Sequence, residues 1–195
     1  MMSRTNLRTI LVLAITTVVI LAGVWLVQAP WKSDGTEGTD PSSVTSIDVE
    51  QVSGLPAPAV GKAATDFTAL TASGEVVRLS DLRGKPVWLV FGATWCANCR
   101  AEAPDVESVA EDYDGRVTVV SIYVGETTST VQGYADRLGL TNPQVPDTSE
   151  ALASTYAIMG IPAHFFIDSQ GTIQKISVGT LTQKAATDIL ASLGQ

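Results

Sequence analysis

The chain has 195 residues and a formal net charge of −8, with a sequence pI near 4.5. This length predicts one folded domain with additional segments. An acidic chain lacks the basic surface that neutralises phosphates, so the composition argues against a nucleic-acid partner.

Near the N-terminus, residues 10–29 form an uninterrupted apolar segment without a charged residue. At about 1.5 Å rise per residue, such a helix spans the bilayer core of about 30 Å. Arg4 and Arg8 precede the segment, and mainly acidic residues follow it. The positive-inside rule therefore predicts a single-pass protein of the cell membrane, with residues 1–9 in the cytoplasm, residues 10–29 in the membrane and residues 30–195 outside.

A cleaved signal peptide is the alternative interpretation of this segment. The apolar run is longer than a usual signal-peptide core, and Pro30 would follow the candidate cleavage site. We therefore favour an uncleaved anchor. Residues 30–60 are rich in Ser, Thr, Asp, Gly and Pro, a composition that predicts a flexible linker.

From residue 61 to 195, strand and helix patterns alternate. This order predicts an α/β domain whose mixed central sheet carries helices on both faces. The expected elements, in chain order, are a short strand and turn in 75–82, a buried strand at 86–92, a helix at 97–112, a buried strand at 116–124, a helix at 127–139, a short helix at 149–157, a hairpin at 163–179 and a C-terminal helix at 182–194.

The sequence "FGATWCANCRAEAP", residues 91–104, holds the only two cysteines, Cys96 and Cys99. A disulfide between them closes a four-residue loop and would add only about 2 kcal/mol of stability, against about 4.7 kcal/mol for a loop of about 100 residues. A closed zinc site needs four ligands, and His164 is the only histidine. A copper site of two thiolates and one imidazole stays open.

A reactive pair is the third interpretation. The cysteines follow a buried strand and open a helix, which places Cys96 at the helix N-terminus and Cys99 one turn further on, where we expect it to be more covered. The unpaired N–H groups and the positive end of the helix dipole there favour a thiolate. In an oxidising extracytoplasmic space the pair will form a disulfide unless something reduces it.

The segment 85–104 resembles the active site of thioredoxin-like proteins. More narrowly, it is similar to membrane-anchored TlpA/ResA-type thiol–disulfide oxidoreductases of the redoxin (AhpC/TSA) superfamily. Residues 66–96 resemble the first hairpin and first core strand of that group, and 160–171 its cis-proline segment. The resemblance covers about 61–195 and implies a thioredoxin-like fold.

The resemblance also implies roles for individual residues. Cys96 is expected to attack, and Cys99 to resolve the mixed disulfide. Glu102, three residues after Cys99, is expected to exchange a proton with the resolving thiol; a solvated helix carboxylate is the alternative. The bond between Ile161 and Pro162 is expected to be cis, facing the disulfide and shaping a substrate groove, with a trans turn as the alternative.

Further residues near the pair carry weaker expectations. Trp95 is predicted to be exposed, where it contacts substrate or only packs. The acidic residues further along the helix are expected to be solvated: Asp105, Glu107, Glu111 and Asp112. The chemistry implied by the resemblance needs no cofactor and no metal.

The sequence departs from the family pattern at several positions. Val90 stands where cytoplasmic thioredoxins carry a buried aspartate. Ala97 and Asn98 separate the cysteines, which leaves the redox potential open. Pro162 is followed by Ala163 and His164 rather than threonine; for His164 a structural role, tuning of a thiolate and metal binding all remain hypotheses.

The resemblance implies exchange of disulfides with protein substrates, here expected as reduction. A membrane electron donor of the CcdA or DsbD type would then re-reduce the protein. Maturation of apocytochrome c is the best-known task of the family, but no residue specifies that client. The alternatives are a disulfide-forming oxidase and a non-enzymatic, Sco-like copper-binding module using Cys96, Cys99 and His164. A peroxidase is disfavoured, because residues 88–95 lack the peroxidatic Pro-x-x-x-Thr-x-x pattern.

Overall fold

A computed structural model describes residues 48–49 and 57–193. The predicted membrane span at 10–29 and most of the predicted linker at 30–60 lie outside the described residues. Within the described part of the chain, no helix is both long enough and apolar enough to cross a bilayer.

A five-stranded mixed sheet forms the centre of the domain, in the order β6-β5-β4-β7-β8. Strands β4, β5 and β6 run parallel, whereas β7 pairs antiparallel with β4 and β8 antiparallel with β7. These strands are β4 (Val87–Gly92), β5 (Thr118–Val124), β6 (Gln144–Asp147), β7 (Ala163–Ile167) and β8 (Ile173–Val178).

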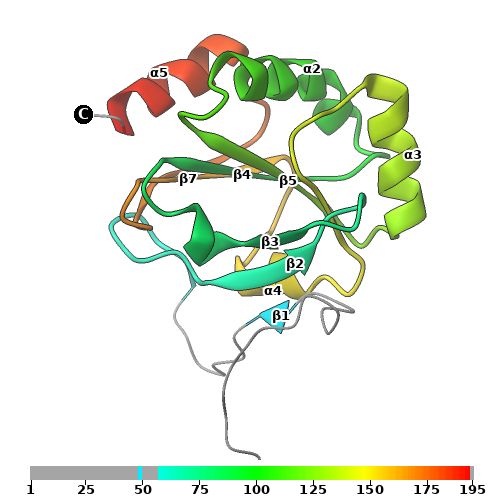
Figure 1. The fold of residues 1–195 in the computed structure, drawn as a ribbon, viewed down its shortest axis with the longest axis horizontal. Helices are drawn as coiled ribbons and strands as arrows, with labels where there is room; N and C mark the ends of the chain where they lie inside the picture. Colours follow the sequence, from blue (N-terminus) through cyan, green and yellow to red (C-terminus); the bar gives the residue numbers. More distant parts are fainter. Residues whose placement is uncertain (1–47, 50–56, 194–195) are drawn as a thin grey trace, which may run out of the picture. The chain divides into compact units, whose positions relative to one another are not determined.

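Two layers cover the faces of this sheet (Figure 1). Helices α2 (Ala97–Asp112) and α5 (Gln183–Leu193) pack on one face, while α3 (Thr128–Leu138) contacts β6 at the sheet edge. The other face carries a small antiparallel sheet, a 3₁₀ turn and a short helix: β1 (Asp48–Val49), β2 (Phe67–Leu70), β3 (Val76–Arg78), η2 (Leu79–Leu82) and α4 (Ala151–Thr155). The expected helices on both faces are found, but on the second face a sheet provides much of the cover.

Successive side chains of β4 point to opposite faces of the sheet, so the strand contributes to the hydrophobic core on both faces. Trp88 points to the α2 and α5 side, where its ring stacks on Phe166 at a centroid distance of 5.3 Å. Leu89 and Phe91 point to the other side and pack with Leu152 of α4. All six residues of β4 are buried, as the continuous apolar run predicts for a strand covered on both faces.

The predicted elements are found in the predicted order, but three further strands are present: β2, which only the resemblance implied as part of a first hairpin, and β6 and β1. Strand β6 was not predicted: its sequence "QVPD" is short, contains Pro146 and begins and ends with polar residues, although all four residues are buried. Strand β1, within the predicted flexible linker, pairs with β2 through Asp48 opposite Thr68. Neither segment has the length or alternation by which a strand is recognised in sequence.

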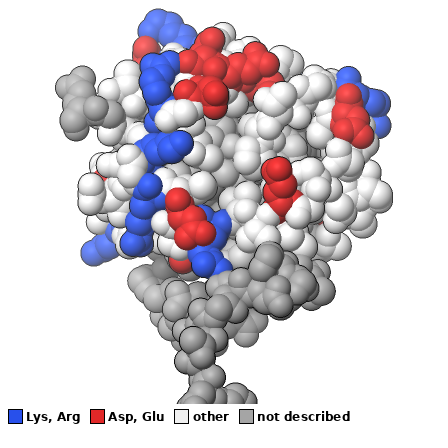
Figure 2. All heavy atoms as spheres, in the orientation of Figure 1, with Lys and Arg blue, Asp and Glu red and all other residues white. Residues whose placement is uncertain are grey.

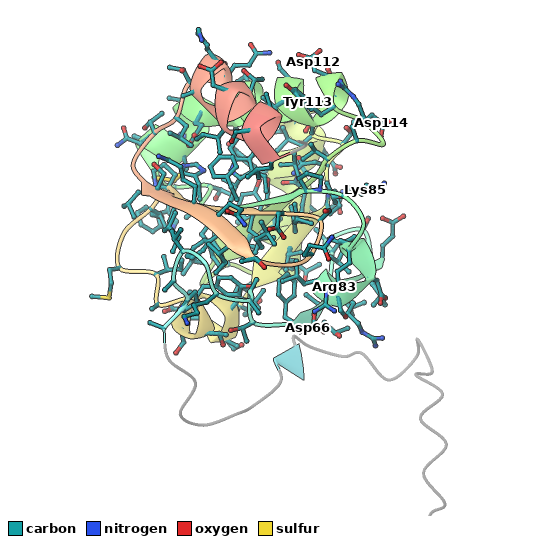
Figure 3. All side chains as sticks on the ribbon, turned by 90° about the vertical axis from the view of Figure 1, so that its left-hand side faces the viewer. Asp66, Arg83, Lys85, Asp112, Tyr113 and Asp114 are labelled. Carbon is teal, nitrogen blue, oxygen red and sulfur yellow. A yellow bond between two sulfur atoms is a disulfide. The ribbon has the colours of Figure 1, made fainter. Side chains whose placement is uncertain are left out.

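Charged side chains are unevenly distributed over the surface. Acidic side chains gather at the top of the view in Figure 2, over the helical layer, and basic side chains form a strip along one side. Figure 3 faces that side and shows basic and acidic residues mixed: Asp66, Arg83, Lys85, Asp112 and Asp114. This side therefore presents no field of a single sign.

Candidate active site

The junction between β4 and α2 positions both cysteines. Cys96 is the N-cap of α2, with extended backbone angles of φ −73° and ψ 120°, and its Sγ accepts a hydrogen bond from the Cys99 N–H at 3.2 Å. The sulfur thus occupies the place where a helix N-terminus leaves N–H groups unpaired. This arrangement confirms the predicted position of Cys96 at the helix start.

Cys96 and Cys99 are joined by a disulfide, with their Cα atoms 5.2 Å apart. Helix α2 packs directly against the end of β4, because a Cβ added at Gly92 would lie in contact with the Cys99 Cβ and sulfur, at 3.4 Å. The prediction that Cys99 is the more covered cysteine is wrong: Cys96 is only 8% exposed, whereas Cys99 is partly exposed. Cys99 lines a pocket, which accounts for its exposure.

The segment before β7 lies beside the same pocket. The Ile161–Pro162 bond is cis, as the resemblance implies, and Pro162 lines the pocket with Cys99. Ile161 is partly exposed. Trp95, next to Cys96, is 68% exposed, so its predicted exposure is confirmed.

Glu102 is buried, only 2% exposed, and also lines this pocket. Its Oε1 accepts a hydrogen bond from the Leu181 N–H at 2.8 Å, while its Oε2 has no partner among the described residues. Burial raises the pKa of Glu102 to about 7, with a smaller opposing effect of the Leu181 N–H. The alternative of a solvated helix carboxylate is therefore wrong.

His164 lies next to Glu102 and is fully buried. Its Nε2 is 3.1 Å from the Gly179 carbonyl oxygen and 3.5 Å from Glu102 Oε1. Burial lowers the pKa of His164 to about 4, so the ring is neutral at physiological pH. Within the described residues, no three His, Cys, Asp or Glu side chains gather as potential metal ligands.

Two carboxylates, one that contacts the turn before Cys96 and one on α2, are buried although the sequence did not predict it. Glu126 accepts hydrogen bonds from the backbone N–H of Thr94, at 2.7 Å, and from its hydroxyl, which holds the turn before Cys96. Glu107 accepts from the Thr141 N–H at 2.7 Å, so its predicted solvation is wrong. A signal for Glu126 existed: it follows β5, and the carboxyl ends of parallel neighbours β4 and β5 meet at one edge.

The rest of the pocket wall is partly polar. Asn142 donates a hydrogen bond to the Ser121 hydroxyl, and the Tyr123 hydroxyl donates to Gln144. Cys99 and Glu102 thus line one pocket that has apolar and hydrogen-bonded polar walls. The arrangement places a carboxyl group with a pKa near neutrality in the same pocket as one sulfur of the disulfide.

The opposite pKa shifts of Glu102 and His164 predict a particular dependence of stability on pH. Glu102 binds its proton more tightly in the folded protein, so the stability it contributes falls as pH rises from about 4.5 to about 7. His164 binds its proton less tightly in the folded protein, so its contribution rises with pH from about 4 to about 6.5. Between pH 4.5 and 6.5 the two contributions to the free energy of unfolding therefore change in opposite directions.

Replacing one of the two residues should therefore remove its contribution to the pH dependence of the free energy of unfolding, so that each contribution can be measured separately. Relative to wild type, the free energy of unfolding of Glu102→Gln should rise by about 2–3 kcal/mol between pH 4.5 and 6.5, and that of His164→Gln should fall by a similar amount. Urea unfolding of the oxidised chain at several pH values measures both. Glu107→Gln is the matched control on the same helix. Parallel pH curves for all four proteins would contradict the assignment.

Comparisons with known proteins agree with this geometry. The chain is 36% identical to the thiol–disulfide oxidoreductase ResA of Geobacillus thermodenitrificans over 136 residues, which cover 69% of this chain and 78% of ResA. A thiol:disulfide interchange protein of Chlorobium tepidum superposes with a TM-score of 0.64 at 29% identity, covering 71% of this chain and all of that one.

A secreted disulfide oxidoreductase of Mycobacterium tuberculosis superposes with a TM-score of 0.59 at 28% identity, covering 65% of this chain and 96% of that one. The family model described as the AhpC/TSA family matches residues 60–176. The chain therefore belongs to the AhpC/TSA family and, within it, to the thiol–disulfide oxidoreductases of the ResA type.

Proposed function

We propose that this protein reduces disulfide bonds in other proteins on the outer side of the cell membrane, anchored there by residues 10–29. The observation that carries the proposal is the disulfide at the start of α2, whose Cys99 lines a pocket together with the buried carboxyl group of Glu102. The charge pattern around residues 10–29 supports the orientation. The secreted relative supports an extracytoplasmic place of action.

The reaction uses the two cysteines in turn. In the reduced protein, the Cys96 thiolate attacks one sulfur of a substrate disulfide, and the other substrate sulfur leaves as a thiolate. Cys99 then loses its proton and attacks Cys96 in the mixed disulfide, releasing the second substrate thiol. The substrate gains two electrons and two protons, and the protein leaves with the Cys96–Cys99 disulfide.

Glu102 is proposed to carry the proton in the second step. Its carboxylate accepts the proton of the Cys99 thiol, directly or through a water molecule, and later returns it to a thiolate. A group works best in this role when its pKa lies near the working pH, which the value of about 7 for Glu102 satisfies. Burial supplies that value, because a buried carboxylate loses hydration.

The surroundings of the disulfide are proposed to receive an extended segment of substrate. Trp95, next to Cys96 in the chain, offers an exposed aromatic surface. Pro162 lines the pocket with Cys99, and Ile161 before it is partly exposed. The oxidised protein then needs two electrons, and a membrane donor of the CcdA or DsbD type is proposed to supply them. Apocytochrome c is a proposed client on the strength of the family resemblance alone.

A Cys99→Ser variant should accumulate mixed disulfides with its substrates. Without the resolving thiol, the bond between Cys96 and the substrate sulfur cannot be displaced from within the protein. The adducts are measured as slower bands on non-reducing gels of membranes, identified by mass spectrometry. Cys96→Ser is the matched control and should form none. Equal adduct yields from both variants, or none from Cys99→Ser, would contradict the exchange mechanism.

A Glu102→Gln variant should reduce a model protein disulfide about tenfold to a hundredfold more slowly at pH 7, since general acid–base catalysis is lost. The inflection near pH 7 in the rate profile should vanish as well. Stopped-flow measurement between pH 5 and 8 tests both. Glu107→Gln, the other buried carboxylate on α2, should keep the wild-type rate and inflection. If Glu102→Gln retains them too, Glu102 has no part in proton transfer.

A further inference from the structure

His164 is a buried titratable side chain without a role in the exchange steps above. It lies on β7, two residues after Pro162, and none of its surface is exposed. It points to the helical side of the sheet, where its ring lies 5.8 Å from that of Trp88. Burial of an imidazole costs free energy unless its nitrogens find partners, so its contacts indicate what it does.

The hydrogen bonds of His164 fix which nitrogen carries the proton. Nε2 lies 3.1 Å from the Gly179 carbonyl oxygen. A carbonyl oxygen can only accept, so Nε2 is the protonated nitrogen and donates. The same N–H lies 3.5 Å from Glu102 Oε1. Nδ1 has no hydrogen-bond partner among the described residues, which agrees with a neutral ring carrying its single proton on Nε2.

The loop between β8 and α5 joins His164 to Glu102. Its Gly179 carbonyl accepts from His164, and its Leu181 N–H donates to Glu102 Oε1 at 2.8 Å. Oε1 therefore accepts the loop N–H and also lies 3.5 Å from His164 Nε2, whose hydrogen is donated to the Gly179 carbonyl. Oε2 has no hydrogen-bond partner among the described residues, and Glu102 lines the pocket that Cys99 also lines. The carboxyl group is held by one oxygen, and the other is free to exchange a proton.

We infer that His164 is a positioning residue for the disulfide exchange, whose Nε2–H orients the Glu102 carboxyl group and stabilises its carboxylate form. This inference rests on the proposed proton role of Glu102. When Glu102 gives up its proton, the charge on Oε1 attracts the N–H of His164 at 3.5 Å, because hydrogen bonds to ionised acceptors shorten and strengthen. The neutral imidazole acts as a dipole and does not itself need to ionise.

Apart from the backbone N–H of Leu181, which also lowers the pKa of Glu102, the neighbouring side chains do not supply this stabilisation. On α2, the carboxylate of Asp105 acts in the opposite direction and raises the pKa of Glu102. On either side of His164 in the sheet stand Val90 of β4 and Ser177 of β8, neither of which titrates in this range. Cys99, on the same pocket, is in the disulfide when oxidised. Among these side chains, His164 is the one that favours a charged Glu102.

The test is an NMR titration of the Glu102 carboxyl carbon in the full-length oxidised chain. Replacing His164 with methionine, which keeps bulk but has no donor, should raise the midpoint by about one pH unit, a tenfold change in proton affinity. His164→Gln keeps an N–H donor and should stay close to wild type. Ser177→Ala, beside His164 on β8, should not shift the midpoint. An unchanged midpoint in folded His164→Met would overturn the inference.

The wild-type protein offers a second measurement that does not depend on how a variant folds. The Nε2 signal of His164 should shift with the same midpoint as the Glu102 carboxyl group, while the ring stays neutral. A ring signal that is constant through that pH range would overturn the inference. Both titrations are made on the oxidised protein and need no substrate. If the His164 and Glu102 signals do not titrate together but the protein still reduces its substrate, the role of His164 alone is rejected. If the two signals titrate together but the protein does not reduce its substrate, the proposed function alone is rejected.

Discussion

The functional site depends on the contact between the end of β4 and the start of α2. The helix begins at Ala97 because the Cys96 sulfur accepts the Cys99 N–H, so the reactive group and the helix cap are the same atom. Cys99 packs directly against the end of the strand at Gly92, and Glu126 holds the preceding turn through Thr94. The chemistry of the sulfur atoms and the local stability of the helix are therefore set by one piece of backbone.

Burial gives Glu102 a pKa that suits the proposed proton transfer. Glu102 lies about one turn after Cys99 on α2 and is buried, and the cost of removing a charge from water shifts its pKa toward neutrality. His164 meets it from β7, and both side chains are tied to the β8–α5 loop. Three elements distant in sequence thus meet at one carboxyl group. The sheet holds β7 and β8 in place. Because the dielectric constant inside the protein is low, small changes in the position of a hydrogen-bond donor have a large electrostatic effect on the carboxyl group.

The sequence pattern was sufficient where structure is local. Continuous apolar residues identify β4, and the strand-to-helix order places Cys96 at a helix N-terminus. The cis bond before Pro162 came from the family resemblance. Strand β6 was not predicted, because Pro146 and the polar residues at both of its ends are not typical of a buried strand. The burial of Glu102 was not predictable, because its partner Leu181 lies 79 residues away. The relative cover of the two cysteines was predicted wrongly, since it depends on a pocket formed by several elements.

We propose Cys96 as the attacking sulfur, although it is the less exposed of the two, because it lies at the N-terminus of α2. The most direct measurement is the rate at which iodoacetamide alkylates each cysteine in the reduced full-length chain at neutral pH, followed by peptide mass spectrometry. The helix N-terminus favours the thiolate, which is the reactive form. We predict that Cys96 is modified first and Cys99 only slowly. Faster modification of Cys99 would contradict this account of the site.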